Sequence, residues 1–319
     1  MKSAIQRLTR LKNQIPNPRS LHSQAPKAMA ALNINSKIRM NSGYEIPRLG
    51  YGVYQTPADV TEDVVTKAFE AGYTHIDCAV VYRNEQPCGL AISKSPLPRS
   101  SIFFTSKVMS RPLSYNVAKT QLASTLKNTG LEYLDLLLLH SPYGGREGRK
   151  GAWKALVEAQ EEGKVRSIGV SNFGRHHLEE LEEIIRELEE ERGVGRGGKV
   201  DVGQYEIHPW LRHRDIVEWC DEHGVVVEAY CPLTQSRRLT SPLLVPLAKK
   251  HNKTPAQILL RWSLQKGFVP LPKSVTPARI IENAQLYDFE LTEGDMETLE
   301  MDEYQVMCGW DPTVARLED

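Results

Sequence analysis

Residues 133–172 read YLDLLLLHSPYGGREGRKGAWKALVEAQEEGKVRSIGVSN, and this stretch decides the fold. An apolar run, Tyr133–His140, is followed by an amphipathic helical pattern over Trp153–Glu162 that stops at Gly163. A second apolar run, Val165–Asn172, comes next. Short apolar runs that alternate with longer amphipathic patterns predict parallel strands connected by helices.

The same unit recurs along the rest of the chain. Eight apolar runs, seven of them followed by a helical pattern, predict a TIM-type (β/α)₈ barrel over residues 37–319, with the active site at the C-terminal ends of the strands. The other apolar runs are Leu49–Tyr54, Tyr73–Ala79, Ile102–Val108, Val200–Ile207, Val225–Leu233 and Phe268–Ser274. The other helical patterns are Val60–Ala71, Val117–Leu126, Arg175–Arg192, Ile216–His223, Pro255–Gln265 and Arg279–Tyr287.

A doubly wound dinucleotide-binding sheet is the rival fold, and it carries GxGxxG directly after its first strand. Residues 50–54 stand at that position and read GYGVY instead. A GxGxxG does occur at residues 193–198, but it follows a charged helical pattern and precedes a strand. That order is the reverse of the strand–turn–helix order that aims a helix N-terminus at phosphate. We therefore interpret residues 193–198 as a flexible loop.

Composition limits the classes of partner. The chain has 319 residues, 40% hydrophobic and 25% charged, which is typical of a globular protein. Lys plus Arg and Asp plus Glu number 40 each, so no overall basic field favours nucleic acid. No apolar run is long enough to span a membrane, and no exposed apolar stripe predicts a stable oligomer. We expect neither a nucleic-acid nor a membrane partner, and a monomer or weak dimer.

The five cysteines are odd in number, widely spaced and without a CxxC. This pattern argues against a disulfide framework or a structural zinc site and predicts free thiols in a reducing compartment. We therefore expect a cytoplasmic protein.

Residues 1–36 form a segment of different composition. The chain has no acidic residue before Glu45, whereas several Lys and Arg residues precede it, and Ile5, Leu8, Leu11 and Ile15 fall near one helical face. This composition is typical of a mitochondrial presequence, so a mitochondrial location is the alternative. A disordered tail, or an upstream extension ahead of a start at Met29, would leave the same pattern. We predict a disordered or targeting extension over residues 1–36.

Polar side chains stand at the C-terminal ends of the apolar runs. Packing alone does not require them there, and in a barrel these ends converge on one pocket. The residues are Asp77 with Tyr82 in the loop behind it, Lys107, His140, Ser171, Asn172, Gln204, Tyr230, Lys273 and Ser274.

Four of these residues suggest acid chemistry at a carbonyl oxygen. Tyrosine is a weak acid, with an ordinary pKa of about 10, and an adjacent lysine ammonium lowers that pKa. Asp77 would keep the charge on a buried Lys107, and His140 would orient the substrate oxygen. No Ser/His/Asp or Cys/His relay is evident, so a hydride from a bound cofactor best supplies the nucleophile.

Several motifs occur in the order found in one known family. Residues 72–85 read GYTHIDCAVVYRNE, and residues 105–107, 137–140 and 169–173 read TSK, LLLH and GVSNF. Residues 271–283 read LPKSVTPARIIEN. In this order the motifs resemble the aldo-keto reductase family, from about Ile38 to the last helix.

The resemblance implies an NADPH-dependent reduction of aldehydes or ketones to alcohols. It implies a catalytic tetrad of Asp77, Tyr82, Lys107 and His140, with Tyr82 as the acid, and no metal. The alternative is an NADPH-binding regulatory or structural subunit with little turnover. A barrel isomerase or lyase would need a phosphate loop after the seventh strand, and residues 231–234, CPLT, do not offer one.

The resemblance also implies a binding site for NADPH. Two cations and a hydroxyl near the adenosine 2′-phosphate favour NADPH over NADH. The nicotinamide would be held by Ser171, Asn172 and Gln204 with Tyr230 stacked on its ring, the 2′-phosphate by Lys273, Ser274 and Arg279, the adenine by Glu282 and Asn283, and further contacts would come from Gly52, Val53, Pro232 and Leu233.

Some positions depart from the commoner family pattern. Tyr54 and Ser141 stand where many members carry Trp, and Cys231 stands where Ser is usual. Tyr54, Ser141 and Trp310 would line the substrate pocket, so we expect a more open pocket and broad substrate tolerance. Trp310 is the only large anchor expected in the short C-terminal segment. We expect the acids Glu206 and Asp215 to be solvated rather than metal ligands.

Overall fold

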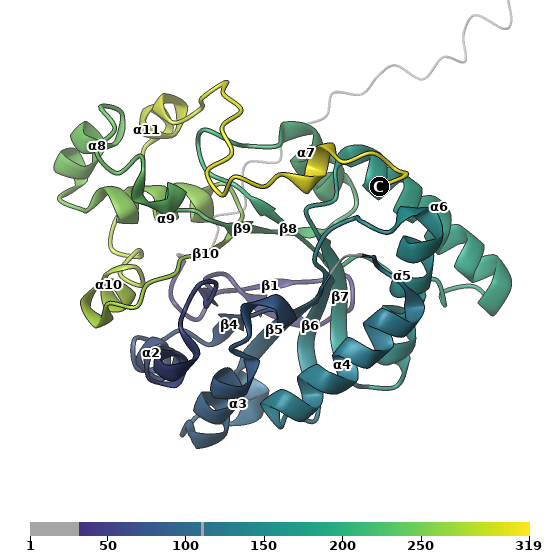
Figure 1. Ribbon diagram of the computed structural model, residues 1–319. Helices are drawn as coiled ribbons and strands as arrows, with labels where there is room; N and C mark the ends of the chain where they lie inside the picture. Colours follow the sequence, from purple (N-terminus) through teal and green to yellow (C-terminus); the bar gives the residue numbers. More distant parts are fainter. Residues whose placement is uncertain (1–31, 110–111) are drawn as a thin grey trace, which may run out of the picture. The chain divides into compact units, whose positions relative to one another are not determined.

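Eight parallel strands make the centre of the structure, a computed structural model that describes residues 32–109 and 112–319 (Figure 1). The Gly50 and Gly52 amides donate to the Pro270 and Pro272 carbonyls, with N···O distances of 3.1 and 3.0 Å, and so link the first strand to the last. The barrel is nearly closed, which confirms the predicted TIM-type fold. The strands, each paired with the next, are β3 (Tyr51–Gly52), β4 (His75–Asp77), β5 (Phe103–Val108), β6 (Leu134–Leu139), β7 (Val165–Ser171), β8 (Val202–Glu206), β9 (Val226–Tyr230) and β10 (Val269–Leu271).

Helices follow the strands, and most begin or end within a few residues of the predicted bounds. The last predicted helix is shorter than expected, because the Gln257 side-chain amide donates to the carbonyls of Glu282 and Gln285 and the chain turns there. The helices are α2 (Ala58–Glu70), α3 (Glu85–Lys94), α4 (Tyr115–Thr129), α5 (Gly145–Glu161), α6 (Arg175–Arg192), α7 (Arg214–Glu222), α8 (Leu244–His251), α9 (Pro255–Gln265), α10 (Pro277–Glu282) and α11 (Glu293–Thr298). The 3-10 turns are η1 (Val80–Tyr82), η2 (Arg99–Ser101), η3 (Thr234–Ser236) and η4 (Pro312–Val314).

An antiparallel hairpin of β1 (Lys37–Arg39) and β2 (Glu45–Pro47) fills the N-terminal end of the barrel. Met40 and Ile46 pack in one buried cluster with strand residues such as Phe103 and Val202. The Asn41 side-chain amide donates to the Val200 carbonyl at 2.8 Å, just before β8. The strands are parallel, so their polar C-terminal ends lie at the opposite end of the barrel from this hairpin.

The GxGxxG at residues 193–198 lies in the predicted place, between α6 and β8. The Trp153 indole donates to the Gly197 carbonyl at 2.9 Å. A Cβ atom on Gly197 would lie 2.3 Å from the Ile185 carbonyl oxygen. Gly197, an intervening residue of the pattern, therefore has to be glycine because the loop packs closely on α6.

All five cysteines are free thiols, as predicted. None of the helices in residues 32–109 and 112–319 has the length and the apolar character needed to cross a membrane. The extension predicted over residues 1–36 lies, up to residue 31, outside the described residues. A cavity of about 530 Å³ lies beside the β1–β2 hairpin, and no predicted site residue lines it in the described part of the chain.

The contact between α3 and α4 leaves no room for a side chain at Gly89. A Cβ atom there would lie 2.1 Å from the Thr129 carbonyl oxygen and 2.6 Å from its Cα. Gly89→Ala should lower the free energy of unfolding by about 1–3 kcal/mol, measured by urea denaturation. Gly294→Ala is the matched control in α11, because a Cβ atom at that position would have no neighbouring side chain or loop within 4 Å. An unchanged or raised stability in Gly89→Ala would contradict this packing.

Candidate active site

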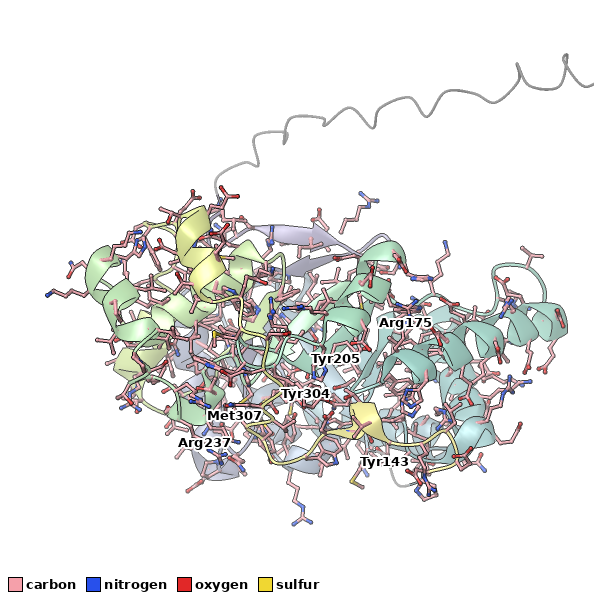
Figure 2. The ribbon with its side chains drawn as sticks, turned by 90° about the horizontal axis from the view of Figure 1, so that it is seen from above. Tyr143, Arg175, Tyr205, Arg237, Tyr304 and Met307 are labelled. Carbon is pink, nitrogen blue, oxygen red and sulfur yellow. The ribbon has the colours of Figure 1, made fainter. Side chains whose placement is uncertain are left out.

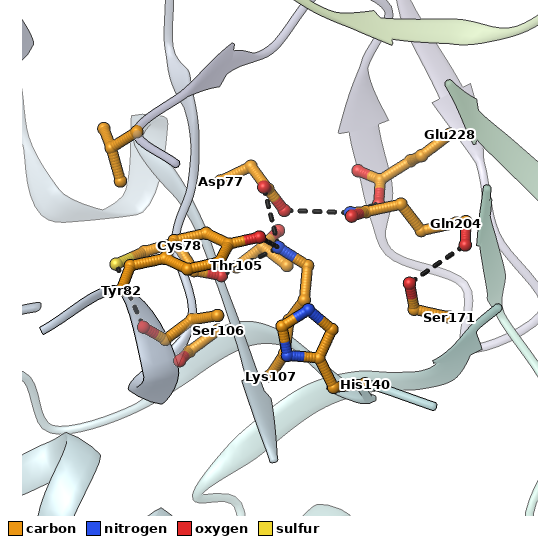
Figure 3. A network of polar contacts seen from close by, with 12 residues as sticks. Asp77, Cys78, Tyr82, Thr105, Ser106, Lys107, His140, Ser171, Gln204 and Glu228 are labelled. Atoms are coloured by element: carbon orange, nitrogen blue, oxygen red, sulfur yellow. Dashed lines mark hydrogen bonds and ion pairs between the residues drawn. The ribbon is translucent and has the colours of Figure 1, made fainter. Parts of the chain in front are cut away.

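The four residues of the predicted tetrad meet at the C-terminal end of the barrel (Figure 3). Asp77 ends β4, Lys107 lies near the end of β5, and His140 directly follows β6. Tyr82 ends η1, the short turn behind β4. Neighbouring parallel strands bring their ends together, and so residues far apart in the sequence share one site.

The Lys107 ammonium is the centre of the cluster. Its Nζ donates to Asp77 Oδ1 at 2.7 Å, to the Cys78 carbonyl at 3.0 Å and to Tyr82 Oη at 3.2 Å. Three acceptors match the three protons of an ammonium group with no exposed surface. Burial by itself would lower the pKa of Lys107, but the charges of Asp77 and Tyr82 raise it above the ordinary value. Lys107 therefore stays protonated.

The phenol of Tyr82 differs from the sequence expectation. Burial raises the pKa of Tyr82 above its ordinary value, and the nearby Lys107 charge offsets only part of that rise. The reason is that burial destabilises the charged phenolate more than the adjacent Lys107 ammonium stabilises it. The negative charge of Asp77 destabilises the phenolate further. Tyr82 therefore holds its proton near neutral pH, as a proton donor must.

His140 faces Tyr82 with its ring. The two ring centroids lie 5.9 Å apart in an edge-to-face arrangement. Burial, followed by the Lys107 charge, lowers the pKa of His140 to about 3. The imidazole is therefore neutral and can form a hydrogen bond without adding a second cation to the site.

Two residues hold the loop that carries Tyr82. The Asn84 side-chain amide donates to the carbonyls of Val53 and Thr56 at 2.9 and 3.0 Å. The Glu85 carboxylate accepts from the hydroxyls of Ser106 and Thr125 at 2.7 and 2.9 Å. The sequence showed Asn84 and Glu85 within a motif, but only the structure shows that they brace this loop.

The residues predicted to hold the nicotinamide lie beside the tetrad. The Ser171 hydroxyl donates to the main-chain carbonyl of Gln204 at 3.0 Å. The Asn172 amide donates to the His140 carbonyl at 3.0 Å, and the Tyr230 hydroxyl donates to Asn172 Oδ1 at 2.8 Å. Asn172 has a φ of 61°, a left-handed conformation that Asn adopts more readily than most residues. These hydrogen bonds hold the side chains of Ser171 and Asn172 and the ring of Tyr230 close together beside the tetrad.

The residues predicted to meet the adenosine phosphate lie along β10 and α10. Lys273 follows β10, donates to the Gln55 carbonyl at 3.2 Å, and has a pKa lowered by burial. Arg279 is exposed on α10, whereas Ser274 and Asn283 are largely buried. The Glu282 carboxylate accepts from the Thr254 hydroxyl at 2.8 Å, so one of its oxygens already has a partner.

The remaining predicted cofactor residues lie at two strand ends next to the tetrad. Gly52 ends β3, and the amide of Val53 donates to the Asp77 carbonyl at 3.1 Å. Pro232 and Leu233 lie between β9 and η3, directly after Cys231, whose φ is 52°. The structure therefore places all four near the same end of the barrel.

Aromatic rings predicted to line the substrate pocket flank the tetrad on both sides. The Tyr54 ring centroid lies 5.0 Å from that of Tyr82, and the Trp310 centroid lies 6.0 Å from that of His140. Tyr54 is 49% exposed and Trp310 is 38% exposed, whereas Ser141 is fully buried. Two of the three predicted pocket residues thus stand at the surface next to the tetrad.

The C-terminal segment is anchored differently from the prediction. Glu206 was expected to be solvated, but the structure shows it buried. Its carboxylate accepts hydrogen bonds from the main-chain amides of Met307 and Cys308, and it also contacts the His208 imidazole. The reason is that the segment passes the end of β8 at Met307 and Cys308, and Figure 2 shows Tyr304 and Met307 of this segment. Farther along, the buried Arg149 donates to the Leu317 carbonyl at 2.7 Å. Trp310 is therefore one anchor among several.

Among the described residues, one group of three side chains has metal-ligating atoms close together. The sulfurs of Cys231 and Cys308 and a carboxylate oxygen of Glu206 all lie within 4.8 Å of one another. A hydrogen bond with Cys231, followed by burial and the charge of Glu206, raises the pKa of the Cys308 thiol. The Glu206 oxygens already have backbone partners, so hydrogen bonding accounts for this group without an ion.

Sequence reasoning missed the buried groups beneath the tetrad. Glu228 lies inside β9 with no exposed surface, and its carboxyl contacts Gln204 and His75. His75 also contacts the Thr105 hydroxyl at 3.1 Å. An acidic residue within an apolar run was the available signal, because a charged side chain inside a barrel strand requires polar partners.

Comparisons with known proteins agree with this geometry. Residues 48–301 match the model of the aldo/keto reductase family. An uncharacterised oxidoreductase of Schizosaccharomyces pombe is 39% identical over 289 residues, which cover 89% of this chain and 100% of the relative. Glyoxal reductase of Bacillus subtilis is 38% identical over 269 residues, covering 84% and 93%. The crystal structure of an aldo/keto reductase from Brucella melitensis matches with a TM-score of 0.77 and 36% identity, covering 85% of this chain and 99% of that one. The chain therefore belongs to the aldo/keto reductase family.

Proposed function

We propose that residues 37–319 form an enzyme that reduces aldehydes or ketones to alcohols with NADPH. The observation that carries the proposal is the contact of Lys107 Nζ with Asp77 Oδ1 and Tyr82 Oη. A neutral phenol next to a paired ammonium can give its proton to an oxygen that gains negative charge. NADPH would supply the hydride for the carbonyl carbon.

Each member of the tetrad has a proposed role. Tyr82 is the proton donor, and Lys107 stabilises the phenolate that remains after transfer. Asp77 keeps Lys107 charged and in position. His140, neutral and facing Tyr82, orients the carbonyl oxygen by a hydrogen bond. The exposed Tyr54 and Trp310 rings would contact the rest of the substrate and tolerate varied shapes.

The side chains beside the tetrad fit NADPH. A carboxamide needs both donors and acceptors, and Ser171, Asn172 and Gln204 offer both. The Tyr230 ring is a flat surface for the nicotinamide, held by its bond to Asn172. Lys273 and Arg279 suit the 2′-phosphate, and Glu282 and Asn283 on the same segment suit the adenine.

Turnover with a panel of carbonyl compounds tests the proposal. NADPH consumption is followed by absorbance with aldehydes, ketones and small dicarbonyls, the last because the Bacillus subtilis relative is a glyoxal reductase. Steady turnover supports an enzyme. Tight NADPH binding with no turnover of any compound would favour the regulatory or structural subunit instead.

Cofactor preference should depend on Arg279. This side chain is exposed on α10, so Arg279→Gln should fold normally. Loss of a charge-assisted hydrogen bond to phosphate should lower kcat/KM for NADPH by about 10- to 100-fold and leave that for NADH nearly unchanged. Steady-state kinetics with both cofactors measure the two values. An equal loss with NADPH and NADH would contradict the role of Arg279 at the 2′-phosphate.

A further inference from the structure

One amide group joins two buried carboxyls beneath the tetrad. Gln204 Nε2 donates to Asp77 Oδ2 and to Glu228 Oε2, both at 2.8 Å (Figure 3). Asp77 comes from β4, Gln204 from β8 and Glu228 from β9, so the bond pair crosses the barrel interior. All three residues are at most 4% exposed.

This arrangement determines which way the Gln204 amide points. Both hydrogens of its NH₂ group are directed at carboxyl oxygens, and reversing the amide would place its carbonyl oxygen against those oxygens. The Gln204 carbonyl oxygen Oε1 is therefore turned away from both carboxyls. Within the proposed function, Oε1 is the acceptor offered to the amino group of the nicotinamide carboxamide.

Among the residues that the structure describes, no cation is bonded to Glu228 on its other side. Its Oε1 lies 3.4 Å from His75 Nε2, and burial followed by the Lys107 charge lowers the pKa of His75 to about 3, so that this imidazole is neutral. The neighbour on β10, Val269, is apolar. Of the charged groups that act on Glu228, Asp77 opposes its ionisation and Lys107 favours it only in part. Burial, followed by the Asp77 charge, raises the pKa of Glu228 to about 8.

We propose that Glu228 is a positioning residue that acts on the tetrad through Gln204. It holds the Gln204 amide in the orientation that presents Oε1 to the cofactor. By keeping its own proton near neutral pH, it leaves Asp77 as the single negative charge beside Lys107. The inference rests on the proposed NADPH-dependent reduction and adds a residue to it.

Ionisation of Glu228 should slow the reaction. Above about pH 8 a second negative charge would lie next to Asp77. That charge would hold the Tyr82 proton more tightly, which makes Tyr82 a weaker acid. The kcat for carbonyl reduction, measured at saturating NADPH, should therefore fall as pH rises through about 8.

Glu228→Gln tests the charge. Glutamine keeps an acceptor for Gln204 and a donor for His75 but cannot ionise. We expect its kcat at pH 6.5 to stay within about threefold of the unmodified protein, and the decrease near pH 8 to disappear. A purely structural role would lower kcat equally at every pH. An unmodified protein with no decrease near pH 8, or a decrease kept in Glu228→Gln, would overturn the proposal.

Glu228→Leu tests the positioning. Losing the acceptor should weaken NADPH binding by about tenfold, measured by quenching of protein fluorescence. In a Gln204→Leu background the same change should cost nothing further, because the residue through which Glu228 acts is already gone. An equal loss in both backgrounds would overturn action through Gln204. If Glu228→Leu fails to fold, the pH profile of Glu228→Gln still decides.

Failure of the proposed carbonyl reduction and failure of the inference about Glu228 would give different experimental results. If the unmodified protein binds NADPH but turns over no carbonyl, the proposed function fails, and NADPH binding by the Gln204 and Glu228 variants still tests the positioning. If turnover is normal and depends on Tyr82, but the Glu228 variants match the unmodified protein in both readouts, only the inference about Glu228 fails.

Discussion

Tyr82→Phe is expected to lower kcat by about 10²- to 10⁴-fold and to leave NADPH affinity within about twofold. The variant removes only the hydroxyl that contacts Lys107 Nζ at 3.2 Å. The ring and its packing against Tyr54 and His140 would remain. Single-turnover oxidation of bound NADPH measures the chemical step, and fluorescence quenching measures cofactor binding.

Tyr44→Phe is the matched control for this variant. Tyr44 is 47% exposed in the loop that connects β1 to β2, at the opposite end of the barrel. Its turnover should equal that of the unmodified protein. Turnover retained in Tyr82→Phe would show that another group donates the proton. A loss of NADPH binding in Tyr82→Phe would show a role in the cofactor site rather than in proton transfer.

Lys107→Met is expected to lower both turnover and stability. It leaves the Asp77 carboxylate buried without the cation that contacts it at 2.7 Å. Breaking a buried pair in this way costs about 3–5 kcal/mol of the free energy of unfolding. Turnover should fall at least as far as in Tyr82→Phe, because the phenolate loses its stabilising charge. Urea denaturation and single-turnover kinetics measure the two effects.

The double variant Asp77→Asn, Lys107→Met separates the causes. It removes the uncompensated charge, so it should regain most of the lost stability and none of the turnover.

The raised pKa of Lys107 determines the pH range in which the ion pair with Asp77 stabilises the fold. Its stabilising effect is fully present below the ordinary lysine pKa of about 10.4 and is lost only as pH rises through the raised value. The deficit of Lys107→Met should therefore be the same at pH 6 and pH 7, below the range in which Glu228 ionises, and a stability equal to that of the unmodified protein would contradict the pairing.

The sequence predicted both the barrel and the proximity of the four tetrad residues, because both follow from the order of strands and helices along the chain. Apolar runs such as Tyr133–His140 have strand length, and parallel strands place their last residues at one end. Asp77 and Lys107 stand at the ends of neighbouring runs, so their contact follows from the fold.

Other features depend on distances and burial that a sequence does not contain. The helices α3, α8 and α11 escaped prediction because Pro87, Gly89, Pro246 and Gly294 interrupt their patterns. The direction of the Tyr82 pKa follows from the balance of burial and the Lys107 charge, which needs the folded structure. Glu228 escaped notice because its run, residues 225–233, does not show that the side chain points inward.

Transfer of deuterium from NADPD to an aldehyde tests the central claim most directly. The unmodified protein is incubated with cofactor labelled on its transferable position, and the alcohol is analysed by mass spectrometry and NMR. The proposed reduction predicts one deuterium on the carbinol carbon for each NADPD consumed, with the hydroxyl proton from solvent through Tyr82. Cofactor that binds without yielding labelled alcohol, or alcohol without deuterium at that carbon, would contradict hydride transfer by this chain.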